Sequence, residues 1–546
     1  MKNRKNTRPG RAPRDRRLFR YHLILSLSSA LLLSAPWLRL GSLPLLVALV
    51  PLLVLRRSLL AHAGGGLAFG RMLGWSALTF GGWTALTTWW IWYATPVGPV
   101  ASVIIGITLS CTAFMAFHWV EARSKKALGY TLLVTAWISL EYLYLTGEIS
   151  FPWLALGNGF AGDVKLVQWY EYTGIFGGTL WALVSNLTIY EAIVSPARGL
   201  RRWAAPATVV LLPAIVSLTL YHTYKEGDRT VKVHIVQPNL DPYEEKFDMP
   251  QAEQTALMAR LIREAPAGTD YILLPETAID DNLWEESLRL SDEVRTFRRI
   301  VTDEYPGAEL IAGASTFRRY DAGQPRTNTA RTNENIDFWY DAYNSALHID
   351  STGKVGIHHK SVLVVGVEKM PYYNLTRHLS FLIVDLGGIS GQLGVDTVQQ
   401  VFDGPHGVRS AVAICYESIY GEYVAGFANK DAEILFVITN DGWWRDTPGY
   451  RQHFSYARLR AIETRRAIGR SANTGISGAI NPRGDVLASA GWDVRTSLTA
   501  DLPLSDRKTF YMTYGDYIGR LSAYVLALSI LYFIAYRTRR RNHLVD

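Results

Sequence analysis

Long apolar runs without two-residue alternation fill the first part of the chain, residues 21–222. A helix needs about 20 predominantly apolar residues to cross a hydrocarbon core ~30 Å thick, and several of these runs approach that length. The pattern predicts seven membrane spans in this region and an eighth near the C-terminus. The predicted spans are residues 21–38, 41–55, 73–95, 99–120, 127–146, 174–194, 203–222 and 517–536.

The segment 223–516 has a different pattern, in which short β-rich runs alternate with amphipathic stretches. Apolar strands separated by helices indicate an α/β domain whose sheets are covered by helices. The sequence therefore predicts a multi-span helical membrane domain joined to one extramembrane α/β domain. Strands are predicted at 231–237, 271–276, 309–315, 344–350, 410–417 and 434–441, and helices at 251–265, 284–304, 418–430 and 450–468.

Basic residues are concentrated at the two ends of the chain. Residues 1–20 contain nine basic residues and one acidic residue, residues 537–546 contain four and one, and the whole chain has a net charge of +8. The body between these tails is therefore slightly acidic, which excludes an extended nucleic-acid surface. With eight spans, both tails and the basic loops fall on one side, which predicts that side to be cytoplasmic. The segment 223–516 is then periplasmic, on the outer face of a bacterial inner membrane.

Three residues with reactive side chains follow predicted strands or strand-like runs. Glu276 follows YILLP, Lys360 follows GIHH and Cys415 follows SAVAI. Singly, they are ordinary: a solvated glutamate, a surface lysine and a small core cysteine. Together they can supply the base, the cation and the nucleophile that acyl transfer by a thiol requires. The only other cysteine, Cys111, lies in an apolar run, so the chain has neither a disulfide framework nor zinc-type cysteine spacing.

The motifs around these residues resemble the nitrilase superfamily, whose members use a Glu-Lys-Cys triad in that chain order on an αββα sandwich. The three motifs are LLPETAI, HHKSVLVVGVEKMP and ICYESIYGEY. Together with the predicted spans they make the chain similar to the bacterial apolipoprotein N-acyltransferase family, in which a nitrilase-like domain lies between the last two of eight spans. FPWLALGN, VQPNLDPYEEKF and residues 440–484 match this family as well. The chain departs from it at His358 and Val362, where Tyr and His are common, and at Phe247, where Trp is common.

The resemblance implies two half-reactions. Cys415 attacks an acyl ester of a membrane phospholipid, and the thioester then passes the acyl group to the α-amine of an S-diacylglyceryl cysteine at the N-terminus of an apolipoprotein. Glu276 acts as the general base, Lys360 stabilises the oxyanion, and no metal or cofactor is implied. A nearby ammonium and a following helix are expected to favour the thiolate. The expected supporting residues are Glu368, Tyr416 and Glu417.

Three alternatives share parts of this pattern. A membrane-tethered nitrilase-like amidase acting on a small molecule would carry the same triad. A transporter with an accessory domain would need charges within its spans, and Glu141 is the main one, although it also fits an interfacial residue near a span end. A catalytically inactive relative that only binds lipoproteins is the third.

Two further features could contact lipid. Residues 372–388 include the apolar run LSFLIVDL, which is either a core element or a lid at the membrane interface. A set of arginines near the predicted helix 450–468 either binds phosphate headgroups or forms a solvated or salt-bridged face. These arginines are Arg451, Arg458, Arg460, Arg465, Arg466 and Arg470.

Overall fold

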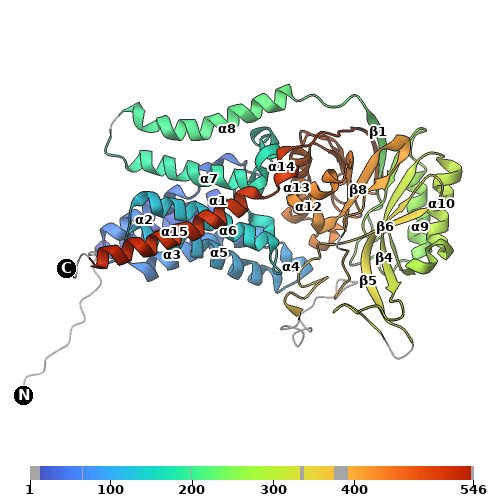
Figure 1. Cartoon of the computed structure of the whole chain (residues 1–546), viewed down its shortest axis with the longest axis horizontal. Helices are drawn as coiled ribbons and strands as arrows, with labels where there is room; N and C mark the ends of the chain where they lie inside the picture. The colour runs from blue at the N-terminus through green and yellow to red at the C-terminus, as the bar shows by residue number, and fades with distance from the viewer. Residues whose placement is uncertain are drawn as a thin grey trace, which may run out of the picture.

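The computed structural model describes residues 13–63, 66–197, 199–332, 337–373, 392–396 and 398–542. A helical region and a β-rich domain lie next to each other along the long axis of the molecule (Figure 1). The chain forms most of the helical region first, then the whole β-rich domain, and returns to the helical region with its last helix. The apolar run LSFLIVDL lies outside the described residues.

Apolar helices make up the first region, as the sequence predicts. Five segments of the described chain are long and apolar enough to cross a membrane: Leu43–Ala61, Gly98–Glu121, Lys126–Thr146, Leu200–Thr223 and Tyr517–Arg540. The remaining three predicted runs also form long helices, but these helices fall short of the same measure. The helices are α1 (Pro13–Ser34), α2 (Val50–Ala61), α3 (Phe69–Thr88), α4 (Ile91–Ala94), α5 (Gly98–Glu121), α6 (Lys126–Thr146), α7 (Tyr170–Val194), α8 (Ala204–Thr223) and α15 (Tyr517–Asn542).

The second apolar segment is longer than the predicted span 41–55. It begins with the 3-10 turn Leu43–Leu46 and continues through α2 to Ala61, past two arginines. The side chain of Arg56 is buried and forms an ion pair with Glu121 of α5. Because this pairing compensates the buried charge, the helix does not have to end before the arginine. The helix therefore continues six residues beyond the predicted span.

The β-rich domain contains two sheets. One has the strand order β13-β1-β2-β4-β5-β6 with β3 paired to β4, and the other has the order β12-β11-β10-β9-β8-β7. The strands of the first sheet are β1 (Thr230–Gln237), β2 (Tyr271–Leu273), β3 (Ile279–Trp284), β4 (Glu309–Arg319), β5 (Tyr340–Ile349), β6 (Val355–His359) and β13 (Thr496–Pro503). Those of the second are β7 (Phe402–Asp403), β8 (Arg409–Ile414), β9 (Ile434–Thr439), β10 (Ala467–Ala472), β11 (Gly478–Ile480) and β12 (Val486–Ser489).

Alternating side chains pack these sheets into an αββα sandwich. In β2, Tyr271 packs between the two sheets, whereas Ile272 packs against helices on the outer face. In β9, Phe436 lies between the sheets and Leu435 faces the helices of the other side. The helices of this domain are α9 (Gln251–Ile262), α10 (Asp292–Arg299), α12 (Gly421–Asn429), α13 (Pro448–Thr464) and α14 (Phe510–Tyr514). The group α12, α13 and α14 lies between the sheets and the helical region (Figure 1).

The first and last strands of this domain are neighbours. β1 pairs antiparallel with β13 over its full length, from Thr230 opposite Pro503 to Gln237 opposite Thr496. The chain therefore enters and leaves the β-rich domain through adjacent strands, soon after α8 and shortly before α15.

One predicted helix is wrong at its end. The sequence predicts a helix over 450–468, but α13 stops at Thr464 and β10 begins at Ala467. Arg465 lies between them in the left-handed region, with a φ of 51°. The change of direction brings β10 beside β9 in the second sheet, where the two strands pair in parallel.

Candidate active site

Strand ends bring the predicted base and cation into contact. Glu276 lies three residues after β2, and Lys360 directly follows β6 in the same sheet. The Lys360 Nζ donates to Glu276 Oε1 at 3.1 Å, and the two side chains are only 1% and 7% exposed. Two residues that are 84 positions apart in the chain thus form a buried ion pair at the edge of the sandwich.

A second carboxylate completes the surroundings of this ammonium. Lys360 Nζ also donates to Glu368 Oε1 at 2.8 Å. Asn344 Nδ2 bridges the same two acids, at 2.8 Å from Glu276 Oε1 and 3.0 Å from Glu368 Oε1. Burial lowers the pKa of Lys360, but the charges of Glu276 and Glu368 outweigh it and raise the pKa overall. The two carboxylates therefore favour the charged form of Lys360.

Cys415 stands on a sharp bend directly after β8. Its φ is 50°, in the left-handed region that residues other than glycine seldom adopt, and it begins the 3-10 turn Cys415–Ile419. Burial and then the charge of Glu276 raise the pKa of the Cys415 thiol, while Lys360 lowers it. The helix expected to favour the thiolate, α12, begins only at Gly421, whereas the lowering effect of Lys360 agrees with the expectation for a nearby ammonium. A neutral thiol needs a base at the moment of attack.

Glu417 joins the bend at Cys415 to the loop that carries the lysine. Its Oε1 accepts from the backbone N–H of Ser361 at 2.6 Å, and its Oε2 accepts from that of Ile414 at 2.8 Å. The Tyr423 hydroxyl donates to Oε1 at 2.8 Å. Burial raises the pKa of Glu417, but hydrogen bonding and the charge of His358 lower it further than burial raises it. This buried carboxylate therefore connects the end of β8 to the residue that follows Lys360.

Tyr416, one of the expected supporting residues, contacts the helical region. Its hydroxyl donates to the Ser150 carbonyl of the helical region at 2.8 Å, and its ring lies against Tyr420. The structure thus connects Tyr416 to the helical region rather than to Lys360 and Glu276. Phe247, at a position where the family often has Trp, stacks on Trp443 with ring centroids 5.8 Å apart.

Three residues near the base were not predicted. The Asn440 backbone N–H donates to Glu276 Oε2 at 3.0 Å, and Asn344 binds the other oxygen. Lys246 is buried and donates to the Thr277 carbonyl at 2.6 Å. Burial lowers the pKa of Lys246 to about 8, against the opposing effect of Asp280 and Glu276. Lys246 does lie within the matching segment VQPNLDPYEEKF, which was the available signal.

A network of buried polar side chains contacts the backbone carbonyl of Cys415. His453 Nε2 lies 3.2 Å from the Cys415 carbonyl oxygen, and His453 Nδ1 lies 2.9 Å from Asp441 Oδ1. Arg470 donates to the second oxygen of Asp441 at 2.9 Å. Ser418 Oγ donates to the same cysteine carbonyl at 2.7 Å. These bonds offset the strain of the left-handed backbone at the predicted nucleophile.

The arginine set contacts protein rather than open surface. Four of its six members are buried. Arg465 binds Glu171 Oε2 at 2.9 Å and Gln168 Oε1 at 2.7 Å, which links the β-rich domain to α7 and its preceding turn. Headgroup binding is therefore the wrong interpretation for the buried members. The salt-bridged interpretation is confirmed for Arg460, Arg465 and Arg470, whereas Arg466 donates to backbone carbonyls such as that of Ala432. The buried members are Arg460, Arg465, Arg466 and Arg470.

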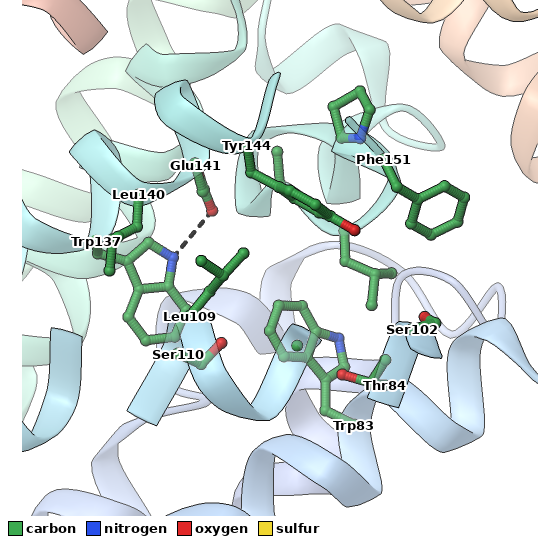
Figure 2. A pocket seen from close by; sticks show the side chains of 14 residues that line it. Trp83, Thr84, Ser102, Leu109, Ser110, Trp137, Leu140, Glu141, Tyr144 and Phe151 are labelled. Atoms are coloured by element: carbon green, nitrogen blue, oxygen red, sulfur yellow. Dashed lines mark hydrogen bonds between the residues drawn. The ribbon is translucent and has the colours of Figure 1, made fainter. Parts of the chain in front are cut away.

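Glu141 faces a cavity inside the helical region (Figure 2). The cavity has a volume of about 60 Å³ and is lined mainly by apolar and aromatic groups of α3, α5, α6 and the turn that follows α6. Glu141 accepts hydrogen bonds from Trp137 Nε1, the Leu156 N–H and Thr179 Oγ1 at 2.9, 2.9 and 2.7 Å. It joins α6 to α7 through Thr179, and its hydrogen-bond partners all lie within the helical region.

Two family models match the chain. The carbon-nitrogen hydrolase model matches residues 232–511, just over half of the chain, and the apolipoprotein N-acyltransferase N-terminal domain model matches residues 29–188. The first model confirms the predicted nitrilase-like fold of the β-rich domain. Among solved structures, an amidase from Nesterenkonia sp. is similar at 16% identity and a TM-score of 0.36, over 54% of this chain and 97% of that one.

Curated relatives match over most of their length. The chain is 30% identical over 503 residues to the apolipoprotein N-acyltransferase of Chlorobaculum tepidum, which covers 88% of this chain and 90% of the relative. It is 30% identical over 459 residues to the protein of the same name from Bradyrhizobium diazoefficiens, covering 80% of each. Together with the carbon-nitrogen hydrolase match and the motifs around Glu276, Lys360 and Cys415, this shows that the chain belongs to the apolipoprotein N-acyltransferase family.

Proposed function

We propose that this protein transfers an acyl group from a membrane phospholipid to the N-terminal S-diacylglyceryl cysteine of apolipoproteins, the last step of lipoprotein maturation. The observation that supports this most directly is the buried contact of Lys360 with Glu276 and Glu368, together with the Cys415 bend, whose thiol pKa responds to the charges of Glu276 and Lys360. In a chain of this family, these groups fit acyl transfer through a thioester.

In the first half-reaction, Glu276 takes the proton of the Cys415 thiol as the sulfur attacks the ester carbonyl of the phospholipid. The Lys360 ammonium stabilises the negative charge that develops on the carbonyl oxygen. The carbon–oxygen bond of the ester then breaks, and Glu276 returns the proton to the leaving alkoxide. The products are a thioester at Cys415 and a lysophospholipid.

In the second half-reaction, the α-amine of the diacylglyceryl cysteine attacks the thioester carbonyl, and Glu276 takes a proton from the nitrogen. The carbon–sulfur bond breaks, an amide forms, and the proton returns to the sulfur. Glu368 and Asn344 act as positioning residues because they hold Lys360 and Glu276 in place without contacting the reacting carbonyl. The two half-reactions use the same groups in turn and need no other reactant.

We further propose that all eight long helical segments cross a bacterial inner membrane and that the β-rich domain is periplasmic. The helices α1, α3 and α7 add to the five segments of sufficient length and apolarity. The C-terminal end of α15 lies at the end of the helical region farthest from the β-rich domain (Figure 1). That end carries the basic residues 537–541, which favours a cytoplasmic location for it.

A thioester trap tests the reaction. The purified protein is incubated with a phospholipid carrying a fluorescent acyl chain, and the covalent label is challenged with hydroxylamine. We expect a hydroxylamine-sensitive label in the parent and in Cys111→Ala, which removes the only other thiol, and none in Cys415→Ala. Addition of a diacylglyceryl-cysteine peptide should move the label to the peptide. Folded protein that takes no label from any phospholipid would overturn the assignment and favour the amidase alternative.

A further inference from the structure

A groove runs along the outside of the helical region between α5, α6 and α15. All three helices are long and apolar enough to span a membrane, and the cavity between them has a volume of about 1000 Å³. Most of its lining is aliphatic or aromatic, and three arginines lie at one end. The apolar part includes Ala116, Leu132, Ala136, Leu526, Ile530 and Phe533, and the arginines are Arg123, Arg537 and Arg540.

The arginines at this end have no carboxylate partner among the described residues. The two acids of the helices that form the groove are engaged elsewhere, Glu121 with Arg56 and Glu141 with Trp137 and Thr179. Instead, Arg123 and Arg537 both lie against the ring of Trp119, at 5.1 and 5.5 Å from its centroid. Two guanidinium groups that share one aromatic ring form a concentrated positive charge.

The electrostatics agree with this geometry. Burial, and after it the like charge of Arg537, lowers the pKa of Arg123. The groove therefore holds positive charge that an anion placed between the two arginines would neutralise. Because Arg123 also donates to the Trp119 carbonyl at 3.4 Å, its side chain is held near the rim rather than extended into solvent.

The length of the groove corresponds to one leaflet. Thr112 lines one end on the α5 side, and Arg123, two residues past the end of α5, lines the other. The nine helical steps from Thr112 to Glu121 rise about 14 Å. Half of a typical hydrocarbon core is about 15 Å. The apolar lining thus covers the depth of one set of acyl chains and the arginines lie at the level of its headgroups, with Trp119 in the position that tryptophan favours at an interface.

We propose that this groove binds an anionic phospholipid, with its acyl chains along α5, α6 and α15 and its phosphate between Arg123 and Arg537. The site rests on the membrane arrangement proposed above, which places it in the cytoplasmic leaflet. The basic tails of the chain are excluded as occupants by their charge. An anionic lipid is the occupant whose acyl chains and phosphate match both parts of the groove.

The groove is distinct from the place where the acyl donor reacts. At its other end, α15 is joined to the β-rich domain by an ion pair between Arg520 and Glu422 of α12, at 3.1 Å. Arg520 and Arg537 are 17 residues apart on one helix, a separation of about 26 Å. The proposed lipid is therefore a structural ligand that holds α15 against α5 and α6 on the side opposite to catalysis.

The test measures lipid binding by delipidated full-length protein in detergent, with phosphatidylglycerol and phosphatidylcholine as probes, by native mass spectrometry. We expect phosphatidylglycerol to bind in preference to phosphatidylcholine and to raise the Tm. Each arginine near an anionic lipid is worth about a factor of five in affinity, so Arg123→Gln with Arg537→Gln should weaken phosphatidylglycerol binding about 30-fold. Ala116→Phe, which fills the apolar part without a change of charge, should also prevent binding.

A matched control separates this site from general attraction to basic protein. Arg16→Gln with Arg20→Gln removes two exposed positive charges from the start of α1 and should leave phosphatidylglycerol binding unchanged. An equal loss in both double variants, unchanged binding in Ala116→Phe, or a second copy of the chain in the groove at every lipid concentration would overturn the proposal. Acyl-enzyme formation at Cys415 is measured in the same samples, so that failure of the proposed function is seen separately from failure of this site.

Discussion

Replacement of Glu368 by glutamine tests the central electrostatic feature of the site. The two oxygens of this carboxylate have different donors. Oε1 accepts from Lys360 Nζ and Asn344 Nδ2, and Oε2 accepts from the Val364 N–H at 2.8 Å. An amide of the same shape has only one acceptor oxygen, so in either orientation an N–H group meets another donor.

The expected loss follows from these contacts. An unsatisfied buried donor costs about 1–3 kcal/mol, and the buried Lys360 loses one of its two carboxylate partners. The remaining charge pair then draws Lys360 toward Glu276, which weakens Glu276 as a base and removes the lysine from the oxyanion. A combined effect of about 3 kcal/mol on the transition state corresponds to a rate loss of about 100-fold or more.

The assay is single-turnover formation of the thioester from a fluorescent phospholipid. Glu309→Gln is the matched control, because Glu309 is also buried and also binds a basic side chain, His348, but lies at the start of β4. We expect Glu368→Gln to acylate at least about 100-fold more slowly than the parent and Glu309→Gln to acylate at the parental rate per folded molecule. Acylation of Glu368→Gln within about threefold of the parent would refute the reasoning, because that factor corresponds to less than 1 kcal/mol.

Three further predictions concern stability and geometry. Lys246→Met should raise the free energy of unfolding at pH 7 by up to about 3 kcal/mol, because burial lowers the pKa of Lys246 from 10.5 to about 8. Between pH 8 and 10.5 the unfolded chain keeps the Lys246 proton that the folded protein has lost, so the free energy of unfolding of the parent rises with pH. The stability advantage of Lys246→Met over the parent should therefore shrink over this range. A Tm difference independent of pH would contradict this. Arg465→Met should destabilise the protein by about 3 kcal/mol, because Gln168 loses its buried partner and Glu171 keeps only the half-exposed Arg507, at 3.1 Å. Arg465→Met with Glu171→Met should recover part of the lost Tm; no recovery would show that the ion pair is not the cause. Glu417→Gln should slow thioester formation about 10- to 100-fold, since both oxygens accept from backbone N–H groups, and an unchanged rate would exclude a positioning role.

The sequence predicted elements whose side chains carry a local pattern. The predicted strands at 231–237, 410–417 and 434–441 correspond to β1, β8 and β9, most of whose residues are buried. β10 was missed because its polar residues Arg470 and Ser471 are buried as well, each with a partner far away in the chain. Only the assembled sandwich provides those partners.

The same distinction between local sequence patterns and contacts made only in the folded structure applies to the site residues. Glu276, Lys360 and Cys415 were predicted because motifs mark them, and their catalytic roles stay predictions. Asn344 has no such signal: it is a polar residue inside β5 whose function arises only when β5 lies beside β6 and the loop of Glu368. The burial that raises the pKa of the Cys415 thiol likewise depends on packing that no local pattern reveals.

The pairing of β1 with β13 has a consequence for how the protein is made. β1 is the first part of the β-rich domain to be synthesised, and its partner along one whole edge follows more than 250 residues later. If the domain is periplasmic, the first sheet stays incomplete until almost the entire domain has been exported, and its edge strand is open to incorrect pairing during that time. The helix α15 is synthesised directly afterwards. Completion of the sheet and insertion of the last helix are therefore nearly simultaneous, and a chain truncated before β13 should be a substrate for proteases rather than an enzyme.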